Sequence, residues 1–194
     1  INGTGKSTLL KIAAGLEEPD TGSCTKANHV VIRYLPQTPE FDDTCTVWEH
    51  VEKKMSESTQ WDMEGEAKSM LQTLGIVRLE QKISELSGGQ RKRLALAEIL
   101  MQSCDILVLD EPTAALDPIA EDDIYQKYNE MTRGRTSLFI SHRLASTRFC
   151  DRILFLENGR VAEEGTHDQL MAQNGGYAKL FAVQSKYYKE GKAV

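Results

Sequence analysis

The most informative stretch of this chain is Leu86-Ser87-Gly88-Gly89-Gln90, which runs directly into the basic residues Arg91-Lys92-Arg93. The two adjacent glycines expose bare backbone N–H groups. Apolar residues at helical spacing from Leu94 onward predict a helix that begins at once. The free N–H groups and the positive end of the helix dipole then point the same way, and the Ser87 hydroxyl adds a donor. This combination binds anions. Taken alone, the stretch is explained equally well by an N-capped amphipathic helix that follows a glycine-rich turn.

Composition places the chain among ordinary globular domains. Its 194 residues include 27% charged and 40% hydrophobic ones, enough for the buried core of a single domain. The net charge of -6 argues against a protein held to nucleic acid by its field, so no direct DNA binding is expected. The four cysteines lack metal-ligand spacing, which predicts reduced core thiols in a cytosolic protein. No apolar run approaches the ~20 residues of a membrane span.

A second phosphate-binding pattern opens the chain. Residues Ile1-Asn2-Gly3-Thr4-Gly5-Lys6-Ser7-Thr8 match the end of the loop pattern G-x-x-x-x-G-K-[ST], whose first glycine would precede the first residue. Gly3 and Gly5 allow the backbone to wrap phosphate oxygens. Lys6 supplies a positive charge for the β- and γ-phosphates, and the Ser7 hydroxyl suits Mg²⁺. Because Gly-Lys-Ser also occurs in ordinary loops, the match gains its weight from the rest of the chain.

A buried strand carries two carboxylates at its end. The run Ile106-Leu107-Val108-Leu109 has four consecutive apolar residues, which predicts a strand of a parallel sheet covered on both faces. Asp110 and Glu111 follow at its carboxyl end, where α/β proteins place their ligands. A helix N-cap before Pro112 is the local alternative. The Gly-Lys-Ser loop elsewhere in the chain favours metal and water chemistry.

Local patterns predict the remaining elements. Helices are expected over 7–14, 44–58, 62–74, 118–131 and 176–190, strands over 30–35 and 136–141, and a hairpin over 152–163. The pair Asn158-Gly159 favours the hairpin turn. His142 follows a strand at the edge that carries phosphates, so a γ-phosphate contact is favoured over a structural role. His50 is interpreted as a satisfied or surface histidine, and His167 as a helix cap.

The ordered set of motifs resembles the nucleotide-binding domain of ATP-binding-cassette (ABC) ATPases over essentially the whole chain. The similar motifs are the Walker A loop (Gly3 to Ser7), the Q-loop glutamine (Gln37), the signature (Leu86 to Gln90), the Walker B strand with its glutamate (Ile106 to Glu111), the D-loop (Ala115-Leu116-Asp117) and the switch histidine (His142). The resemblance implies an α/β P-loop NTPase fold of the ABC type. This fold has a mostly parallel central sheet flanked by helices. In this chain the resemblance implies a small helical subdomain over about 44–100, within one domain over 1–194.

The resemblance also implies roles for individual residues, with ATP and Mg²⁺ as cofactors and ATP hydrolysis to ADP and phosphate as the activity. The implied nucleotide-binding residues are Asn2, Gly3, Thr4, Gly5, Lys6, Ser7 and Thr8. The implied catalytic residues are Glu111, His142 and Gln37, and the implied Mg²⁺ residues are Ser7, Gln37 and Asp110. Ser87, Gly88, Gly89 and Gln90 would contact ATP held by a second copy, and Asp117 would lie at that interface.

The two halves of the chain are similar to different branches of the family. Residues 1–100 resemble soluble F-type members that act on ribosomes, on the evidence of Tyr34 to Phe41 and Arg91-Lys92-Arg93. From about Ala114 onward the chain resembles the ATPase end of membrane exporters. Glu98 departs from the family because arginine usually stands there. The strand that leads into the Walker A loop would precede the first residue, so we expect this chain to be N-terminally truncated and to bind ATP weakly.

The leading interpretation is the ATPase domain of an ABC transporter, which powers transport through partner transmembrane domains. It would pair with a second ABC ATPase domain, as a homo- or heterodimer, and lie in the cytoplasm at the inner or plasma membrane through its partners. The alternatives are a soluble F-type ATPase that acts on ribosomes and a truncated fragment that does not hydrolyse ATP.

Overall fold

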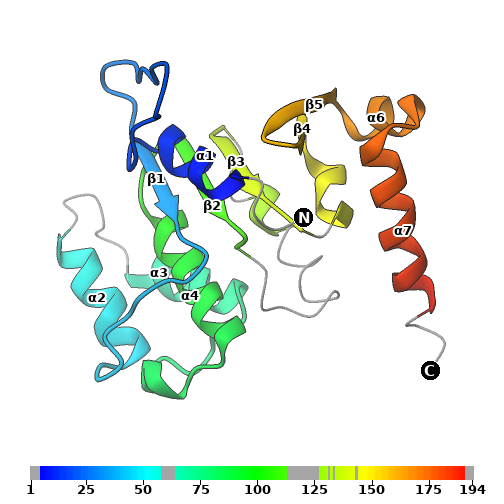
Figure 1. Cartoon of the computed structure of the whole chain (residues 1–194). Coiled ribbons are helices and arrows are strands. Elements are labelled where there is room, and N and C mark those ends of the chain that lie inside the picture. Colours follow the sequence, from blue (N-terminus) through cyan, green and yellow to red (C-terminus); the bar gives the residue numbers. More distant parts are fainter. Residues whose placement is uncertain are drawn as a thin grey trace. The chain divides into compact units, whose positions relative to one another are not determined.

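The computed structural model describes residues 5–57, 64–112, 127–130, 132, 134–142 and 144–190. The chain divides into two compact units (Figure 1). We call residues Leu10–Ile140 the sheet unit, and residues Ile1–Leu9 with Ser141–Val194 the hairpin unit. Each is described by itself, and the single domain over 1–194 stays a prediction.

The sheet unit is an α/β structure built on a parallel sheet. Its elements are α1 (Lys6–Ala13, in this unit from residue 10), β1 (Ile32–Leu35), α2 (Val47–Glu57), α3 (Glu64–Thr73), the 3₁₀ turn η1 (Ile83–Glu85), α4 (Gly88–Met101), β2 (Ile106–Asp110) and β3 (Thr136–Ile140). The strands pair in parallel in the order β1-β2-β3, with β2 in the middle (Figure 1). The predicted parallel α/β sheet is therefore confirmed.

Alternate side chains of β2 pack into apolar clusters on the two faces of the sheet. Leu107 and Leu109 belong to a large cluster formed with the helices that follow β1, whereas Val108 belongs to a smaller cluster with Leu10 of α1. Successive strand residues point to opposite faces, so one strand serves both clusters. This explains why its apolar run shows no polar alternation.

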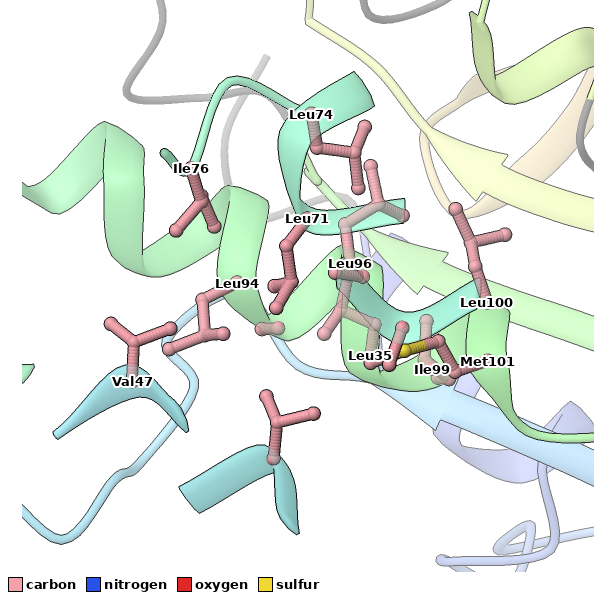
Figure 2. Packing of buried hydrophobic residues seen from close by; sticks show 14 of the residues in the cluster. Leu35, Val47, Leu71, Leu74, Ile76, Leu94, Leu96, Ile99, Leu100 and Met101 are labelled. Atoms are coloured by element: carbon pink, nitrogen blue, oxygen red, sulfur yellow. The ribbon is translucent and has the colours of Figure 1, made fainter. Parts of the chain in front are cut away.

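The larger cluster lies around the second half of α4. Leu94 and Leu96 of that helix pack with Leu71 of α3, and α4 also contacts β1 (Figure 2). Seven residues between Leu94 and Met101 are buried, so the second half of this helix is enclosed on nearly all sides. Among the described residues, the α-helices α2, α3 and α4 lie in the range predicted as a helical subdomain, although its status as a subdomain stays a prediction.

The hairpin unit is smaller and has its own core. It contains the 3₁₀ segment η2 (Leu144–Phe149), β4 (Ile153–Glu157), β5 (Arg160–Gly165), α6 (His167–Gln173) and α7 (Gly176–Glu190). The antiparallel hairpin turns at Asn158 and Gly159, which both have positive φ (50° and 73°), as the sequence predicted. Buried Leu144, Ile153, Leu170, Tyr177 and Phe181 form its core.

Two local expectations were wrong. Thr166, not His167, caps α6, because the Thr166 side chain accepts a hydrogen bond from the Gln169 backbone N–H. His167 is the first helical residue, and its Nδ1 lies 2.8 Å from the Tyr177 hydroxyl. Cys24 is exposed rather than in a core, although all four cysteines are free thiols as expected. Of the helix predicted over 118–131, the structure describes residues 127–130, which are helical.

Among the described residues, no helix combines the length and apolar character needed to cross a membrane.

Candidate functional site

The diglycine stretch forms the start of α4, as predicted. Ser87 is the N-cap, and its Oγ accepts a hydrogen bond from the Gln90 backbone N–H at 3.2 Å. The Gln90 Oε1 in turn accepts from the Ser87 backbone N–H at 2.9 Å, which completes a capping box. The first N–H groups of any helix lack an intrahelical acceptor, and Gly88 and Gly89 occupy these positions. The capped helix and the anion site are therefore compatible.

The carboxyl end of β2 carries a buried carboxylate. Asp110 is the last residue of β2 and only 3% exposed. The Tyr34 hydroxyl on β1 donates a hydrogen bond to Asp110 Oδ2 over 3.3 Å. Burial, together with the nearby Asp110 carboxylate, raises the pKa of Tyr34 to about 12. Tyr34 therefore stays protonated and acts as a donor to Asp110 across the physiological pH range.

Glu111 follows in an unusual backbone conformation. Its φ is 51°, a left-handed value that is uncommon for a residue other than glycine. The Gln37 side-chain amide donates to Glu111 Oε2 at 3.0 Å, and the Lys92 ammonium donates to the Glu111 carbonyl oxygen at 3.0 Å. Burial lowers the pKa of Lys92, while Glu111 and Asp110 oppose that shift. The backbone and the side chain of Glu111 thus both accept hydrogen bonds from residues elsewhere in the sheet unit.

Of the predicted site residues, Gln37, Asp110 and Glu111 belong to the sheet unit, where Gln37 contacts Glu111 directly. Tyr34 and Lys92 were not predicted to contact the two carboxylate residues. The sequence gives no signal for the Tyr34 contact, because it depends on the register of the sheet: Tyr34 pairs with Val108, two residues before Asp110, on one face. Lys92 was interpreted only as part of a basic cluster.

That basic cluster is largely engaged within the sheet unit. The Arg91 guanidinium pairs with Asp43 at 2.5 Å, and Lys92 binds the Glu111 carbonyl. The Arg93 guanidinium approaches Gly75 so closely that a Cβ there would lie 2.8 Å from its Nη1. Arg91 and Lys92 thus have partners inside the chain, whereas the buried Nε of Arg93 has no hydrogen-bond partner among the described residues. The ribosomal alternative stays a prediction.

The hairpin unit contains the predicted site residues Gly5, Lys6, Ser7, Thr8 and His142. Gly5 has a positive φ of 76° and precedes Lys6, the first residue of α1, which also contains Ser7 and Thr8. His142 follows β3 by two residues, and its carbonyl oxygen accepts a hydrogen bond from Gln184 at 2.7 Å. The predicted site residues Asn2, Gly3, Thr4 and Asp117 lie outside the described residues. Convergence of Lys6, Ser7 and His142 with the two carboxylates stays a prediction.

Glu98, which stands where the family usually has arginine, has a partner in the structure. His50 is 9% exposed, and its Nε2 lies 3.2 Å from Glu98 Oε2. The His50 ring also meets Phe41 edge to face, with centroids 5.2 Å apart. The interpretation of His50 as a satisfied histidine is confirmed. Glu98 therefore packs against α2 inside the sheet unit.

Comparisons with known proteins all point to the same family. Residues 1–114 match the family model described as ABC transporter. Over 93% of its length the chain is 35% identical to the glutathione/L-cysteine transport system ATP-binding/permease protein CydD of Bacillus subtilis, of which it spans 34%. It thus covers about a third of this curated relative. The likeness of residues 1–100 to F-type members stays a prediction.

Two solved structures share the fold. One is a bacterial Atm1-family ABC exporter with ATP bound, at 27% identity and a TM-score of 0.80, covering 95% of this chain and 35% of that one. The other is a dimeric ATP-binding cassette in a post-hydrolysis state bound to ADP and Pi, at 27% identity and a TM-score of 0.72, covering 86% and 82%. From the motifs, the parallel sheet and these matches, we conclude that the chain belongs to the ABC transporter family and carries its ATP-binding domain.

Proposed function

We propose that this chain binds and hydrolyses ATP and thereby powers transport through partner transmembrane domains. The observation that carries the proposal is the arrangement of Glu111, whose carboxylate is held by Gln37 at the end of β2, directly after buried Asp110. A carboxylate anchored there is suited to accept a proton from an attacking water. Exporter and cassette relatives with ATP or with ADP and Pi support the same chemistry.

The roles of the other residues follow from the charge of the triphosphate. Lys6 would hold the β- and γ-phosphates, and His142 would donate a hydrogen bond to the γ-phosphate as charge develops on it. Bound Mg²⁺ would neutralise the phosphate oxygens. Ser7, Gln37 and Asp110 offer hydroxyl, amide and carboxylate oxygens, the hard ligands that Mg²⁺ prefers, with water and phosphate completing its shell.

A second ATPase domain is part of the proposal. The chain has two candidate phosphate cradles, the α4 start and the Lys6 loop, but only one Glu111. Two copies placed head to tail, or this chain with a related one, would bring Ser87, Gly88 and Gly89 of one domain onto ATP held by the other. Such reciprocal use of one surface is a closed two-fold arrangement. One solved cassette with this fold is a dimer.

Location follows from the same proposal. We place the domain in the cytoplasm, at the inner or plasma membrane, through its transmembrane partners. Co-purification distinguishes this from the ribosomal alternative. Recovery with a membrane protein supports the transporter, whereas salt-sensitive recovery with ribosomes would support the F-type ATPase.

The test of the proposed function is the substitution Glu111→Gln. It keeps the shape and the contact with Gln37 but removes the base, so phosphate release at saturating Mg-ATP should fall by about 10²–10⁴-fold. ATP binding and ATP-dependent dimerisation, followed by calorimetry and light scattering, should persist. The matched control is Glu80→Gln at an exposed position, which should hydrolyse ATP at the parent rate. Parent-like turnover by Glu111→Gln would exclude the role given to Glu111.

A further inference from the structure

We propose that Gln184 of α7 is a positioning residue for His142, and that it acts by fixing the backbone on which the histidine stands. The inference rests on the proposed function, in which His142 contacts the γ-phosphate. Neither the sequence motifs nor the proposed mechanism assigns a role to Gln184 or to the helix that carries it.

The Gln184 side chain forms hydrogen bonds with the main chain of two residues, His142 and Leu144. Its Nε2 donates to the His142 carbonyl oxygen at 2.7 Å. Its Oε1 accepts from the Leu144 backbone N–H at 2.9 Å. Both distances are those of well-formed hydrogen bonds. One amide group therefore holds the main chain at residues 142 and 144 at the same time.

The chemistry of this contact requires an amide. The main chain offers one acceptor at His142 and one donor at Leu144, so the side chain must supply one donor and one acceptor. Glutamine does so with a single planar group, whereas an ionised carboxylate lacks the donor and an ammonium lacks the acceptor. A glutamine at position 184 therefore matches the acceptor at His142 and the donor at Leu144.

The helix that presents Gln184 is itself firmly held. Tyr177, Phe181 and Gln184 are spaced by four and three residues, so they share one face of α7. Tyr177 is fully buried, and its hydroxyl lies 2.7 Å from Thr147 Oγ1 of η2. The Glu163 carboxylate accepts hydrogen bonds from the backbone N–H groups of Gly176 and Tyr177 at the start of the helix.

This face of α7 contacts η2 at two places, through Tyr177 at Thr147 and through Gln184 at Leu144. The segment that begins at His142 therefore cannot shift without breaking contacts to α7. Displacement of a catalytic group by about 1 Å can reduce a rate by about 10²-fold. The helix α7 thus keeps the His142 imidazole within reach of the γ-phosphate.

The activity test is a double-mutant cycle. Gln184→Leu should lower kcat by about ten- to a hundredfold with little change in KM. In a His142→Ala background the same substitution should have no further effect, because the residue that it positions is gone. The matched control is Val183→Leu, which introduces the same side chain at a neighbouring, 51% exposed position and should leave kcat unchanged. An equal loss in both backgrounds would overturn the inference, as would the same loss in the control.

A second readout does not depend on turnover. In the parent, the Leu144 amide should be protected from hydrogen exchange, and its protection should be lost in Gln184→Leu and kept in Val183→Leu. The His142 imidazole resonances should move in the first variant only. Unchanged resonances in a folded Gln184→Leu protein would overturn the inference. Were Gln184→Leu to unfold, Gln184→Glu, which keeps the size and one acceptor, replaces it in both tests. A parent chain without turnover would refute the proposed function, and the NMR result would still decide this inference.

Discussion

Glu111 adopts a left-handed backbone conformation, with φ of 51°, directly after the buried Asp110. For a residue other than glycine such a conformation costs about 1–3 kcal/mol and persists only where its surroundings impose it. Here Lys92 binds its carbonyl oxygen, and Gln37 binds its carboxylate. Strain of this kind collects at functional sites, which agrees with the base that we propose.

Tyr34 provides a prediction at the same scale. Its folded-state pKa is raised from 10.0 to about 12, so the folded protein holds the phenolic proton more tightly than the unfolded chain. The stability that this difference contributes is complete below pH ~10 and is lost as the pH rises towards about 12. We expect the free energy of unfolding, from urea titrations, to fall over this range and to fall less in Tyr34→Phe.

The control for this experiment is the behaviour of both proteins near pH 7. There the tyrosine is protonated in both the folded and the unfolded states, so the difference between parent and Tyr34→Phe should not depend on pH. Parallel stability curves for the two proteins at alkaline pH would contradict the assigned pKa.

The helices of this protein begin in different ways. The helices α4 and α6 are each capped by their own residues, in capping boxes at Ser87 and Thr166. The helix α7 instead receives a carboxylate from β5, because Glu163 binds the N–H groups of Gly176 and Tyr177. Glycine is needed at 176, since a Cβ there would lie 2.7 Å from the Phe155 ring. The start of α7 is thus made by tertiary contact.

Removal of that carboxylate tests this account. Glu163→Ala should lower the free energy of unfolding by about 1–2 kcal/mol, because two helix N–H groups lose a charged acceptor that also complements the helix dipole. The matched control is Glu164→Ala, whose neighbouring exposed carboxylate pairs with Arg152. Exposed pairs contribute about 0–1 kcal/mol. Equal thermal shifts for the two variants would show that Glu163 does not cap the helix.

At the scale of the whole molecule, each unit has its own apolar core. The sheet unit has clusters on both faces of β2, and the hairpin unit has one around Tyr177. The four free cysteines lie in different surroundings: Cys24 is exposed, and Cys45, Cys104 and Cys150 are partly buried. Burial raises the pKa of Cys150 to about 11 and shifts those of Cys45 and Cys104 in the same direction.

These environments predict the order in which the thiols react. Only the thiolate is nucleophilic, so the three partly buried cysteines should react slowly with a disulfide reagent at neutral pH. We expect one fast thiol in the native protein, assigned to Cys24, and four in denaturant. In Cys24→Ser the fast phase should disappear. A fast phase that survives this substitution would contradict the assignment.

The sequence by itself determined the features that depend on chain neighbours. The hairpin turn at Asn158 and Gly159, the helix start at Ser87 and the buried strand before Asp110 were all predicted. Each is specified within a few residues, by positive φ, a cap or an apolar run. The cap of α6 was misplaced by one residue, because Thr166 and His167 are adjacent and threonine is the better cap.

Only the tertiary structure decided which side chains meet across the chain. Tyr34 and Asp110 lie 76 residues apart in sequence, and Gln184 and His142 lie 42 apart. The first contact depends on the register of β1 against β2, and the second on the face that α7 turns towards η2. Register and helix packing are set by the burial of whole faces, and no short stretch of residues contains that information.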